Sequence, residues 1–217
     1  MLSSFENYIF DLDGTIVDSS NEILKCLNLA FQDVGCNIPA VRFSPNLIGP
    51  PIRQIVENIA PEIKDEKTKN NIISSFRQYY DYDNDDCSVL YPKIKDYLNF
   101  LQSSKKKLYI ATFKPKIPTS RIVRMFNLDM FEGVYTVDYP KMFPSKNEMV
   151  EFLLKEENLK IDRTIMIGDS VSDILAGKSN NIATAGVLWG YGKDKSQIIT
   201  QADFIIESTK VLEGIRF

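Results

Sequence analysis

The 217-residue sequence contains no histidine. This absence excludes Ser-His-Asp and Cys-His catalysis and the common zinc sites, because these depend on an imidazole. Acid–base chemistry near neutral pH must therefore use carboxylates, lysine, tyrosine or cysteine. The sequence has three cysteines, Cys26, Cys36 and Cys87, an odd number without a CxxC pair or metal-ligand spacing. We interpret them as reduced thiols of a cytoplasmic protein.

Long apolar runs and an excess of basic charge are also missing. No stretch approaches the roughly 18 apolar residues of a membrane-spanning helix, and no secretory signal is visible at the N-terminus. The formal net charge is −3 and the pI is near 5.2, which argues against binding to nucleic acid or to an anionic membrane. With 44% hydrophobic and 25% charged residues, the composition is that of an ordinary globular protein.

The most informative stretch is Tyr-Ile-Phe-Asp-Leu-Asp-Gly-Thr, residues 8–15. A short apolar run ended by a turn signal predicts a buried strand, and an open α/β sheet keeps its ligand crevice just past such strand ends. An extended backbone would point Asp11 and Asp13 the same way. Two like charges this close require a cation or a shared proton, so a divalent metal, a nucleophile with a proton donor, or both are indicated. The alternative is an Asp-rich turn with no chemical role.

Residues 17–89 are predicted to be entirely helical. Apolar residues recur at helical spacing over 23–31 and 52–59, and a third helix is expected over 65–80. Four prolines within 38–51 predict a loop between the first two helices. A helical block between two strands of a sheet suggests an inserted domain.

The acidic stretch at 81–86 invites comparison with a calcium-binding loop. Asp86 stands where that loop needs glycine, and Pro92 stands where it needs glutamate. We therefore interpret the stretch as a solvated linker, in a position that suits a hinge.

From Pro92 onward, strands and helices alternate. We expect strands at 108–112, 133–137, 164–167, 184–187 and 203–206, and helices at 93–103, 119–126, 146–157 and 171–179. This alternation predicts an α/β fold with a doubly wound parallel sheet and right-handed crossovers. The expected core covers 1–16 and 90–217, and the small all-helical insert covers 17–89.

Two further strand ends carry side chains suited to a phosphate or a metal. Thr112 ends one strand, where its hydroxyl could donate to a phosphoryl oxygen. Asp169 follows another strand, and Asp173 comes four residues later in the first turn of a helix, a pair of carboxylates suited to Mg²⁺. Alone, Thr112 is a common strand residue and the two aspartates could serve only to cap the helix. With Asp11 and Asp13 upstream, the metal interpretation is favoured.

These features resemble, in chain order, the motifs of the haloacid-dehalogenase-like (HAD) phosphohydrolases. The resemblance implies a Rossmann-like core in which Asp11 attacks the phosphorus of a monoester and forms an aspartyl-phosphate that water hydrolyses. Asp13 would protonate the leaving alcohol and later activate water. Mg²⁺ would be held by Asp11, the backbone carbonyl of Asp13 and Asp169, with Asp173 binding it directly or lying just behind these ligands.

The family pattern also requires a lysine at the start of a helix, and two residues compete for this role. Lys146 opens an amphipathic helix, whereas Lys141 lies in a loop between Pro140 and Met142. We favour Lys146, which together with Thr112 would stabilise the transferring oxygens.

The helical insert resembles the cap of the phosphoglycolate phosphatase and β-phosphoglucomutase branch. Residues 47–53 resemble the cap loop that faces the active site there, although Arg53 could equally be a surface residue. The segment 189–192 resembles a loop of the same branch, and its lack of G-x-G-x-x-G argues against a dinucleotide. Substrate contacts are expected at Leu12, Gly49, Arg53, Phe113 and Lys114.

The resemblance therefore implies a Mg²⁺-dependent phosphatase that acts on a small phosphate monoester of the phosphoglycolate or sugar-phosphate type. A phosphomutase, an inorganic pyrophosphatase and a non-catalytic phosphate-binding module remain alternatives. The expected partner is a small phosphorylated metabolite, with no nucleic acid and no membrane, and the expected state is a monomer or homodimer.

Overall fold

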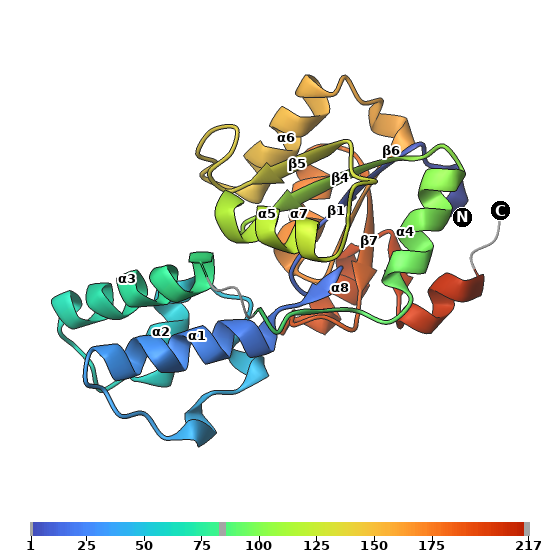
Figure 1. Cartoon of the computed structure of the whole chain (residues 1–217). Helices are drawn as coiled ribbons and strands as arrows, with labels where there is room; N and C mark the ends of the chain where they lie inside the picture. Colours follow the sequence, from blue (N-terminus) through green and yellow to red (C-terminus); the bar gives the residue numbers. More distant parts are fainter. Residues whose placement is uncertain (1, 83–85, 215–217) are drawn as a thin grey trace. The chain divides into compact units, whose positions relative to one another are not determined.

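The computed structural model describes residues 2–82 and 86–214 and divides into two compact units. The core unit comprises 1–18 and 89–217, and the helical unit comprises 19–88 (Figure 1). Strands β2 (Val17–Asp18) and β3 (Val89–Leu90) pair antiparallel within the core unit. The prediction that residues 17–89 are entirely helical is therefore wrong at both ends, where two-residue strands are too short to show an alternating pattern.

The core unit is built on a six-stranded parallel sheet with the order β5-β4-β1-β6-β7-β8. This sheet confirms the predicted doubly wound α/β fold. Phe10 of β1 lies between Ile110 of β4 and Ile167 of β6, so β1 is central and buried along its whole length. The strands are β1 (Asn7–Phe10), β4 (Lys107–Thr112), β5 (Gly133–Thr136), β6 (Thr164–Gly168), β7 (Ala183–Val187) and β8 (Phe204–Ile206).

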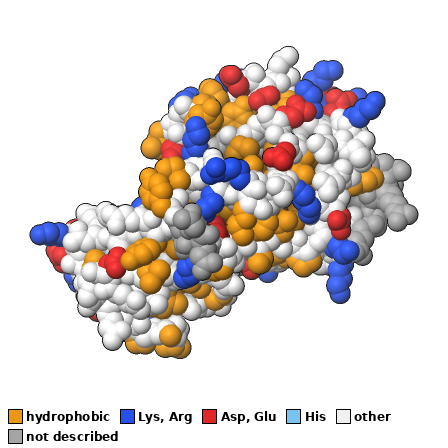
Figure 2. All heavy atoms as spheres, viewed as in Figure 1, with side chains coloured by type: hydrophobic (Ala, Val, Ile, Leu, Met, Phe, Trp, Pro, Cys, Tyr) orange, Lys and Arg blue, Asp and Glu red, His pale blue; other side chains and the backbone are white. Residues whose placement is uncertain are grey.

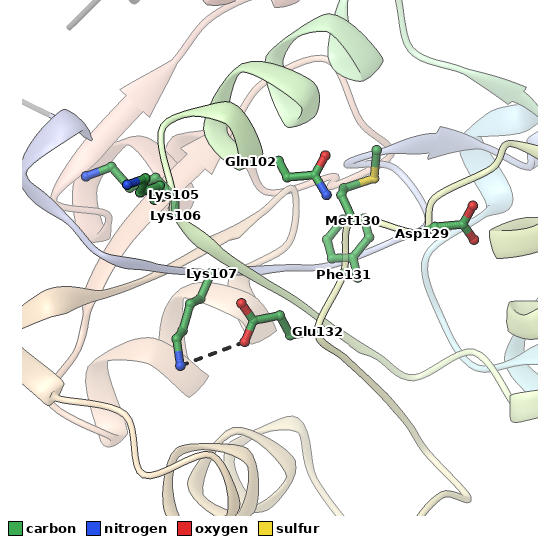
Figure 3. A pocket seen from close by; sticks show the side chains of 8 residues that line it. All are labelled: Gln102, Lys105, Lys106, Lys107, Asp129, Met130, Phe131 and Glu132. Carbon is green, nitrogen blue, oxygen red and sulfur yellow. Dashed lines mark ion pairs between the residues drawn. The ribbon is translucent and has the colours of Figure 1, made fainter.

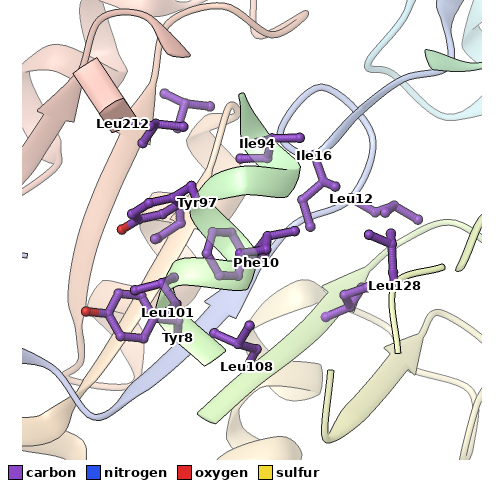
Figure 4. Packing of buried hydrophobic residues seen from close by; sticks show 14 of the residues in the cluster. Tyr8, Phe10, Leu12, Ile16, Ile94, Tyr97, Leu101, Leu108, Leu128 and Leu212 are labelled. Carbon is purple, nitrogen blue, oxygen red and sulfur yellow. The ribbon is translucent and has the colours of Figure 1, made fainter. Parts of the chain in front are cut away.

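Alternate residues of β1 belong to two different apolar clusters, because successive side chains of a strand point to opposite faces. Tyr8 and Phe10 pack in one cluster with Tyr97 and Leu101 of α4 (Ile94–Ser103) (Figure 4). Ile9 packs in the other cluster, which also contains residues of α6 and α7. Each large side chain buried in this way contributes about 1.5–3 kcal/mol. The helices are α4 (Ile94–Ser103), α5 (Lys116–Met125), α6 (Lys146–Glu156), α7 (Val171–Ser179) and α8 (Lys195–Gln201).

Two helices of the core unit differ from the sequence-based expectation. Helix α5 begins at Lys116, three residues before the expected start, directly after Pro115 at its N-cap. Helix α8 was not predicted, because in its seven residues only Ile198 is buried, which leaves no apolar stripe to recognise.

The helical unit contains α1 (Ser20–Asp33), α2 (Ile52–Ile59) and α3 (Glu66–Tyr82). Helices α1 and α3 bury apolar faces, and Asp33 of α1 accepts hydrogen bonds from Ser75 and Tyr79 of α3. Helix α3 continues to Tyr82, so the predicted linker at 81–86 begins as helix; its centre, 83–85, lies outside the described residues. The first and last segments of the unit are also joined, because the buried Glu22 carboxylate accepts a hydrogen bond from the backbone N–H of Cys87 (3.0 Å).

The surface carries charges of both signs. Figure 2 shows basic and acidic side chains interspersed over the visible face, in agreement with the small net charge. Among the described residues, no helix is both long enough and apolar enough to cross a membrane.

Candidate active site

The candidate site lies at the carboxyl ends of three adjacent strands, β4, β1 and β6. Thr112 is the last residue of β4, Asp11 follows the end of β1, and Asp169 follows the end of β6. Because these strands are parallel neighbours, their carboxyl ends meet at one edge of the sheet, where open α/β sheets bind their ligands. The fold thus brings together residues that are more than 150 positions apart in the sequence.

Lys146 lies in the middle of the buried part of the site. It is the first residue of α6, after the N-cap Ser145. Its Nζ atom lies 2.8 Å from Oδ1 of Asp11 and also forms an ion pair with Oδ1 of Asp173. The Nζ atom of Lys141 instead lies over the ring of Phe152, 4.7 Å from its centre. Of the two competing lysines, the structure places Lys146 beside Asp11.

Three buried carboxylates, those of Asp11, Asp169 and Asp173, surround this lysine. One oxygen of each lies within 4.8 Å of the others. Lys146 supplies one positive charge against the three, so the cluster has a deficit of positive charge that a divalent cation would supply. Carboxylate oxygens are the ligands that hard cations prefer, and the cluster fits a divalent metal site of this kind.

The hydrogen bonds of Asp173 distinguish it from the other two carboxylates. Its Oδ1 pairs with Lys146, and its Oδ2 accepts hydrogen bonds from the backbone N–H (3.0 Å) and the hydroxyl (2.6 Å) of Ser170. Ser170 and Asp173 together form a capping box at the start of α7. Through these contacts Asp173 orients Lys146 and the start of α7. Asp169 also accepts hydrogen bonds at both oxygens, but the one at its Oδ1, from the Thr15 hydroxyl, is long (3.4 Å). Asp11 and Asp169 are therefore better placed to bind a cation.

Burial and mutual repulsion shift the pKa values of these groups. Burial, opposed by Lys146 and reinforced by Asp173 and Asp169, raises the pKa of Asp11 to about 8. Burial and the nearby Asp173 raise the pKa of Asp169 to about 7, against the effect of two backbone N–H donors. Burial alone would lower the pKa of Lys146, but attraction to Asp11 and Asp173 outweighs it and the pKa is raised. The raised pKa values of Asp11 and Asp169 favour the uptake of a proton or of a cation by these two groups near neutral pH.

Asp13 lies beside Lys114 in the more open part of the site. The Nζ atom of Lys114 is 3.2 Å from both Oδ1 and Oδ2 of Asp13. Gly14 has φ +83° and turns the chain sharply after Asp13; a Cβ atom at Gly14 would collide with the carboxylate of Asp169. Thr112 accepts a hydrogen bond from the backbone N–H of Lys114 at its hydroxyl oxygen (3.2 Å), which leaves the hydroxyl proton to donate elsewhere.

The other residues expected to contact substrate differ in their surroundings. Leu12 is fully buried in the apolar cluster, so its side chain is a core residue. Phe113 is 42% exposed. In the helical unit, Arg53 of α2 pairs with Glu66 (2.9 Å) and Asn70 of α3. Gly49 has φ +116° and open space where a Cβ atom would lie.

A loop that follows β7, residues 189–192, completes the site. Asp169 accepts hydrogen bonds at Oδ2 from the backbone N–H groups of Tyr191 (2.7 Å) and Gly192 (3.1 Å). A Cβ atom at Gly190 or Gly192 would collide with Asp169. No role in the site was predicted for these residues, although two glycines flanking an aromatic residue after a strand indicate close approach of the backbone to another group.

A hollow of about 400 Å³ lies elsewhere in the core unit, lined by residues 102, 105–107 and 129–132 (Figure 3). Lys107, which pairs with Glu132 at its rim (3.8 Å), begins β4, whereas Thr112 ends it. The hollow therefore opens at the opposite edge of the sheet from the carboxylate cluster and has no part in the candidate site.

A parallel sheet that carries buried carboxylates and a lysine at its carboxyl edge, with a helical insert after its first strand, is an architecture suited to a metal-dependent phosphohydrolase. The sequence comparisons identify the family. A model of the haloacid dehalogenase-like hydrolases matches residues 8–187, and the chain belongs to this family, in its phosphoglycolate phosphatase-like branch with a helical cap.

Several relatives match nearly the full chain. A 5'-nucleotidase of Pseudomonas aeruginosa is 29% identical over 88% of this chain and 86% of its own length. The pyrophosphatase PpaX of Anoxybacillus flavithermus is 30% identical over 95% and 94%. A phosphoglycolate phosphatase of Aquifex aeolicus is 30% identical over 88% of each chain. The solved structure of a haloacid dehalogenase-like hydrolase from Streptococcus pneumoniae has a TM-score of 0.83 at 26% identity, covering 99% of this chain and all of that one.

Proposed function

We propose that this protein is a Mg²⁺-dependent phosphatase that hydrolyses a small phosphate monoester through an aspartyl-phosphate intermediate. The observation that carries the proposal is the position of Asp11 at the end of the central strand, with its Oδ1 paired to the buried Lys146 (2.8 Å). A carboxylate fixed in this way, at the edge where the sheet binds ligands, is suited to attack a phosphorus atom.

The remaining residues support both steps of the reaction. In the first step, Asp11 forms a bond to phosphorus while the ester oxygen leaves with a proton from the Asp13 carboxyl group. In the second step, the Asp13 carboxylate takes a proton from the water that hydrolyses the aspartyl-phosphate. Lys146 and the Thr112 hydroxyl stabilise the charge on the transferring oxygens.

Asp11, Asp169 and the backbone carbonyl of Asp13 are the groups that would hold Mg²⁺. When bound, the ion neutralises the repulsion between the Asp11 carboxylate and an anionic phosphate. The 189–192 loop orients Asp169 for this role through its two backbone N–H donors. Asp173 supports these metal ligands indirectly, because its ion pair holds Lys146 in place.

The helical insert and the relatives support a small phosphorylated substrate. We assign residues 19–88 as a cap domain, which would restrict the site to small substrates such as phosphoglycolate, sugar phosphates or nucleoside monophosphates. Arg53 would read a second anionic group on release from its pairing with Glu66. The likeness to PpaX over 95% of the chain favours inorganic pyrophosphate as a second candidate substrate.

The test is phosphate release from a panel of these esters and from pyrophosphate, with Mg²⁺ and with EDTA. We expect one class of ester to be hydrolysed with Mg²⁺ only, and Asp11→Asn to abolish turnover. Asp162→Asn is the matched control, because Asp162 lies in a short 3-10 helix (Ile161–Arg163) with its side chain 80% exposed. Folded, Mg²⁺-loaded protein that releases phosphate from none of these compounds would contradict the proposal. A preference for pyrophosphate would select the second candidate.

A further inference from the structure

Lys114 was expected to contact the substrate, but its contact with Asp13 indicates a different role. The Nζ atom of Lys114 is equally distant, at 3.2 Å, from both carboxylate oxygens of Asp13. The side chain of Lys114 is 2% exposed, whereas that of Asp13 is 23% exposed. The lysine is thus the enclosed partner of the pair, and the carboxylate is the partner that reaches solvent.

The backbone around Lys114 is fixed on both sides. Strand β4 pairs in register with β1, and the Lys114 N–H donates to the hydroxyl of Thr112, the last residue of that strand. The next residue, Pro115, is the N-cap of α5. A buried lysine between a central strand and a helix start has little freedom to change its position, and charge-assisted hydrogen bonds to both oxygens define the rotation of the partner carboxylate.

We propose that Lys114 is a positioning residue that orients the Asp13 carboxyl group toward the leaving-group oxygen, rather than a ligand of the substrate phosphate. This inference rests on the proposed phosphatase function. In the step concerned, the P–O bond to the leaving group breaks and the proton of Asp13 moves to the departing oxygen. Lys114 keeps its own proton and pairs with both oxygens of the carboxylate that is left. A different buried cation, Lys146, lies beside Asp11 and is available to the phosphoryl group.

If Lys114 positions Asp13, its effect on the rate should depend on the leaving group. If Lys114 binds the substrate phosphate, its effect should not. A departing alkoxide needs the proton of Asp13, whereas nitrophenolate is stable enough to leave without it. A residue that acts through Asp13 should therefore matter for an alkyl phosphate and hardly for p-nitrophenyl phosphate. A residue that binds the phosphoryl group should matter equally for both, because both esters carry the same phosphoryl group.

The experiment measures kcat/KM for an alkyl phosphate and for p-nitrophenyl phosphate with Mg²⁺, in wild type, Lys114→Met, Asp13→Asn and the double variant. The parameter kcat/KM reports the first phosphoryl transfer and excludes hydrolysis of the intermediate. We expect Lys114→Met to lower it at least about tenfold for the alkyl ester and less than about threefold for the aryl ester, as part of the 10²–10⁴ that an acid contributes. In the Asp13→Asn background, Lys114→Met should have no further selective effect.

A second substitution of Lys114 and a control at a neighbouring lysine test whether the result is specific to the loss of the Lys114 charge. Lys114→Gln retains polarity and is expected to show the same selective loss, with the aryl ester reporting that the protein is folded. Lys116→Met is the matched control; Lys116 is two residues away, exposed, with its Nζ over the ring of Tyr139, and its loss should leave the ratio of the two esters unchanged.

Equal losses for both esters in the Lys114 variants, or a loss that persists in the Asp13→Asn background, would overturn the inference and identify Lys114 as a phosphate ligand. Failure of the phosphatase proposal is separately visible, because the wild-type protein would then cleave neither ester.

Discussion

Lys146 is the residue on which the buried half of the site depends. It lies between Asp11 and Asp173, with its side chain 7% exposed, and supplies a positive charge to the three carboxylates that meet there. A buried charge that loses its partner is costly, because nothing replaces the lost solvation. The same ammonium is also the group best placed to stabilise charge on a transferring phosphoryl group. Structural and chemical roles therefore coincide in one side chain.

Replacing Lys146 by methionine should lower phosphatase activity by about 10²–10³-fold, the usual cost of removing one group that stabilises a developing charge. Methionine keeps most of the volume of the lysine stem, so the loss would reflect the charge. The measurement is kcat/KM with the preferred ester under saturating Mg²⁺. Lys141→Met removes a lysine whose Nζ lies over the rings of Phe143 and Phe152, and its activity should stay within about threefold of wild type. A larger effect at Lys141 than at Lys146 would reverse the assignment.

At the scale of elements, the site depends on how closely the 189–192 loop approaches Asp169. The two N–H donors of Tyr191 and Gly192 can reach the carboxylate because Gly190 and Gly192 carry no Cβ atoms. The same loop is tied to β2 and the segment before it, since Tyr191 donates its hydroxyl proton to Asp18 (2.8 Å) and Trp189 donates its indole N–H to the carbonyl of Thr15 (3.1 Å). The loop thus supports both the carboxylate and the chain that follows β1.

Gly192→Ala should weaken Mg²⁺ binding by about 10–100-fold, the range found when groups that orient metal ligands are lost. The added methyl group would collide with the backbone carbonyl oxygen of Asp169, which cannot rotate away. Isothermal titration calorimetry with Mg²⁺ measures the effect. Gly35→Ala is the control: Gly35 has φ +75° but open space around it, so the variant should lose about 1–2 kcal/mol of stability from backbone strain and keep its Mg²⁺ affinity. Unchanged Mg²⁺ affinity in Gly192→Ala would show that the loop does not orient Asp169.

The sequence was sufficient for elements with strong apolar patterns and insufficient for contacts that depend on packing. Strand β1 and the turn after it were predictable because Tyr-Ile-Phe ends at Asp11 and Gly14. Helix α8 was not, because Ile198 alone is buried in it. The ion pair of Lys114 with Asp13 and the approach of Gly192 to Asp169 arise from residues more than 20 positions apart, and no local pattern encodes them. The buried position of Leu12 likewise follows from the tertiary fold.

At the scale of the whole molecule, the carboxylate cluster links stability to pH and to metal. In the folded, metal-free protein the pKa of Asp11 is about 8 and that of Asp169 about 7, both above the value of about 4 for an aspartate in an unfolded chain. At pH values between about 4 and 8, Asp11 and Asp169 therefore bind more protons in the folded state than in the unfolded state. The contribution of the two groups to stability is therefore complete below about pH 4 and is lost as the pH rises through 7 and 8.

Mg²⁺ should reverse this loss, because it takes the place of the protons. We expect the increase in Tm on adding Mg²⁺ to be several °C at pH 8 and markedly smaller at pH 6, where protons compete for the same oxygens. Thermal unfolding at both pH values, with Mg²⁺ and with EDTA, measures this. Asp169→Asn should reduce the pH dependence of the Mg²⁺ effect, while Asp162→Asn, at a side chain that is 80% exposed, should retain it. Calorimetry in buffers of different ionisation enthalpy should also show protons released on binding near pH 7. An equal Tm increase at pH 6 and pH 8, with no proton release, would mean that Mg²⁺ binds away from Asp11 and Asp169.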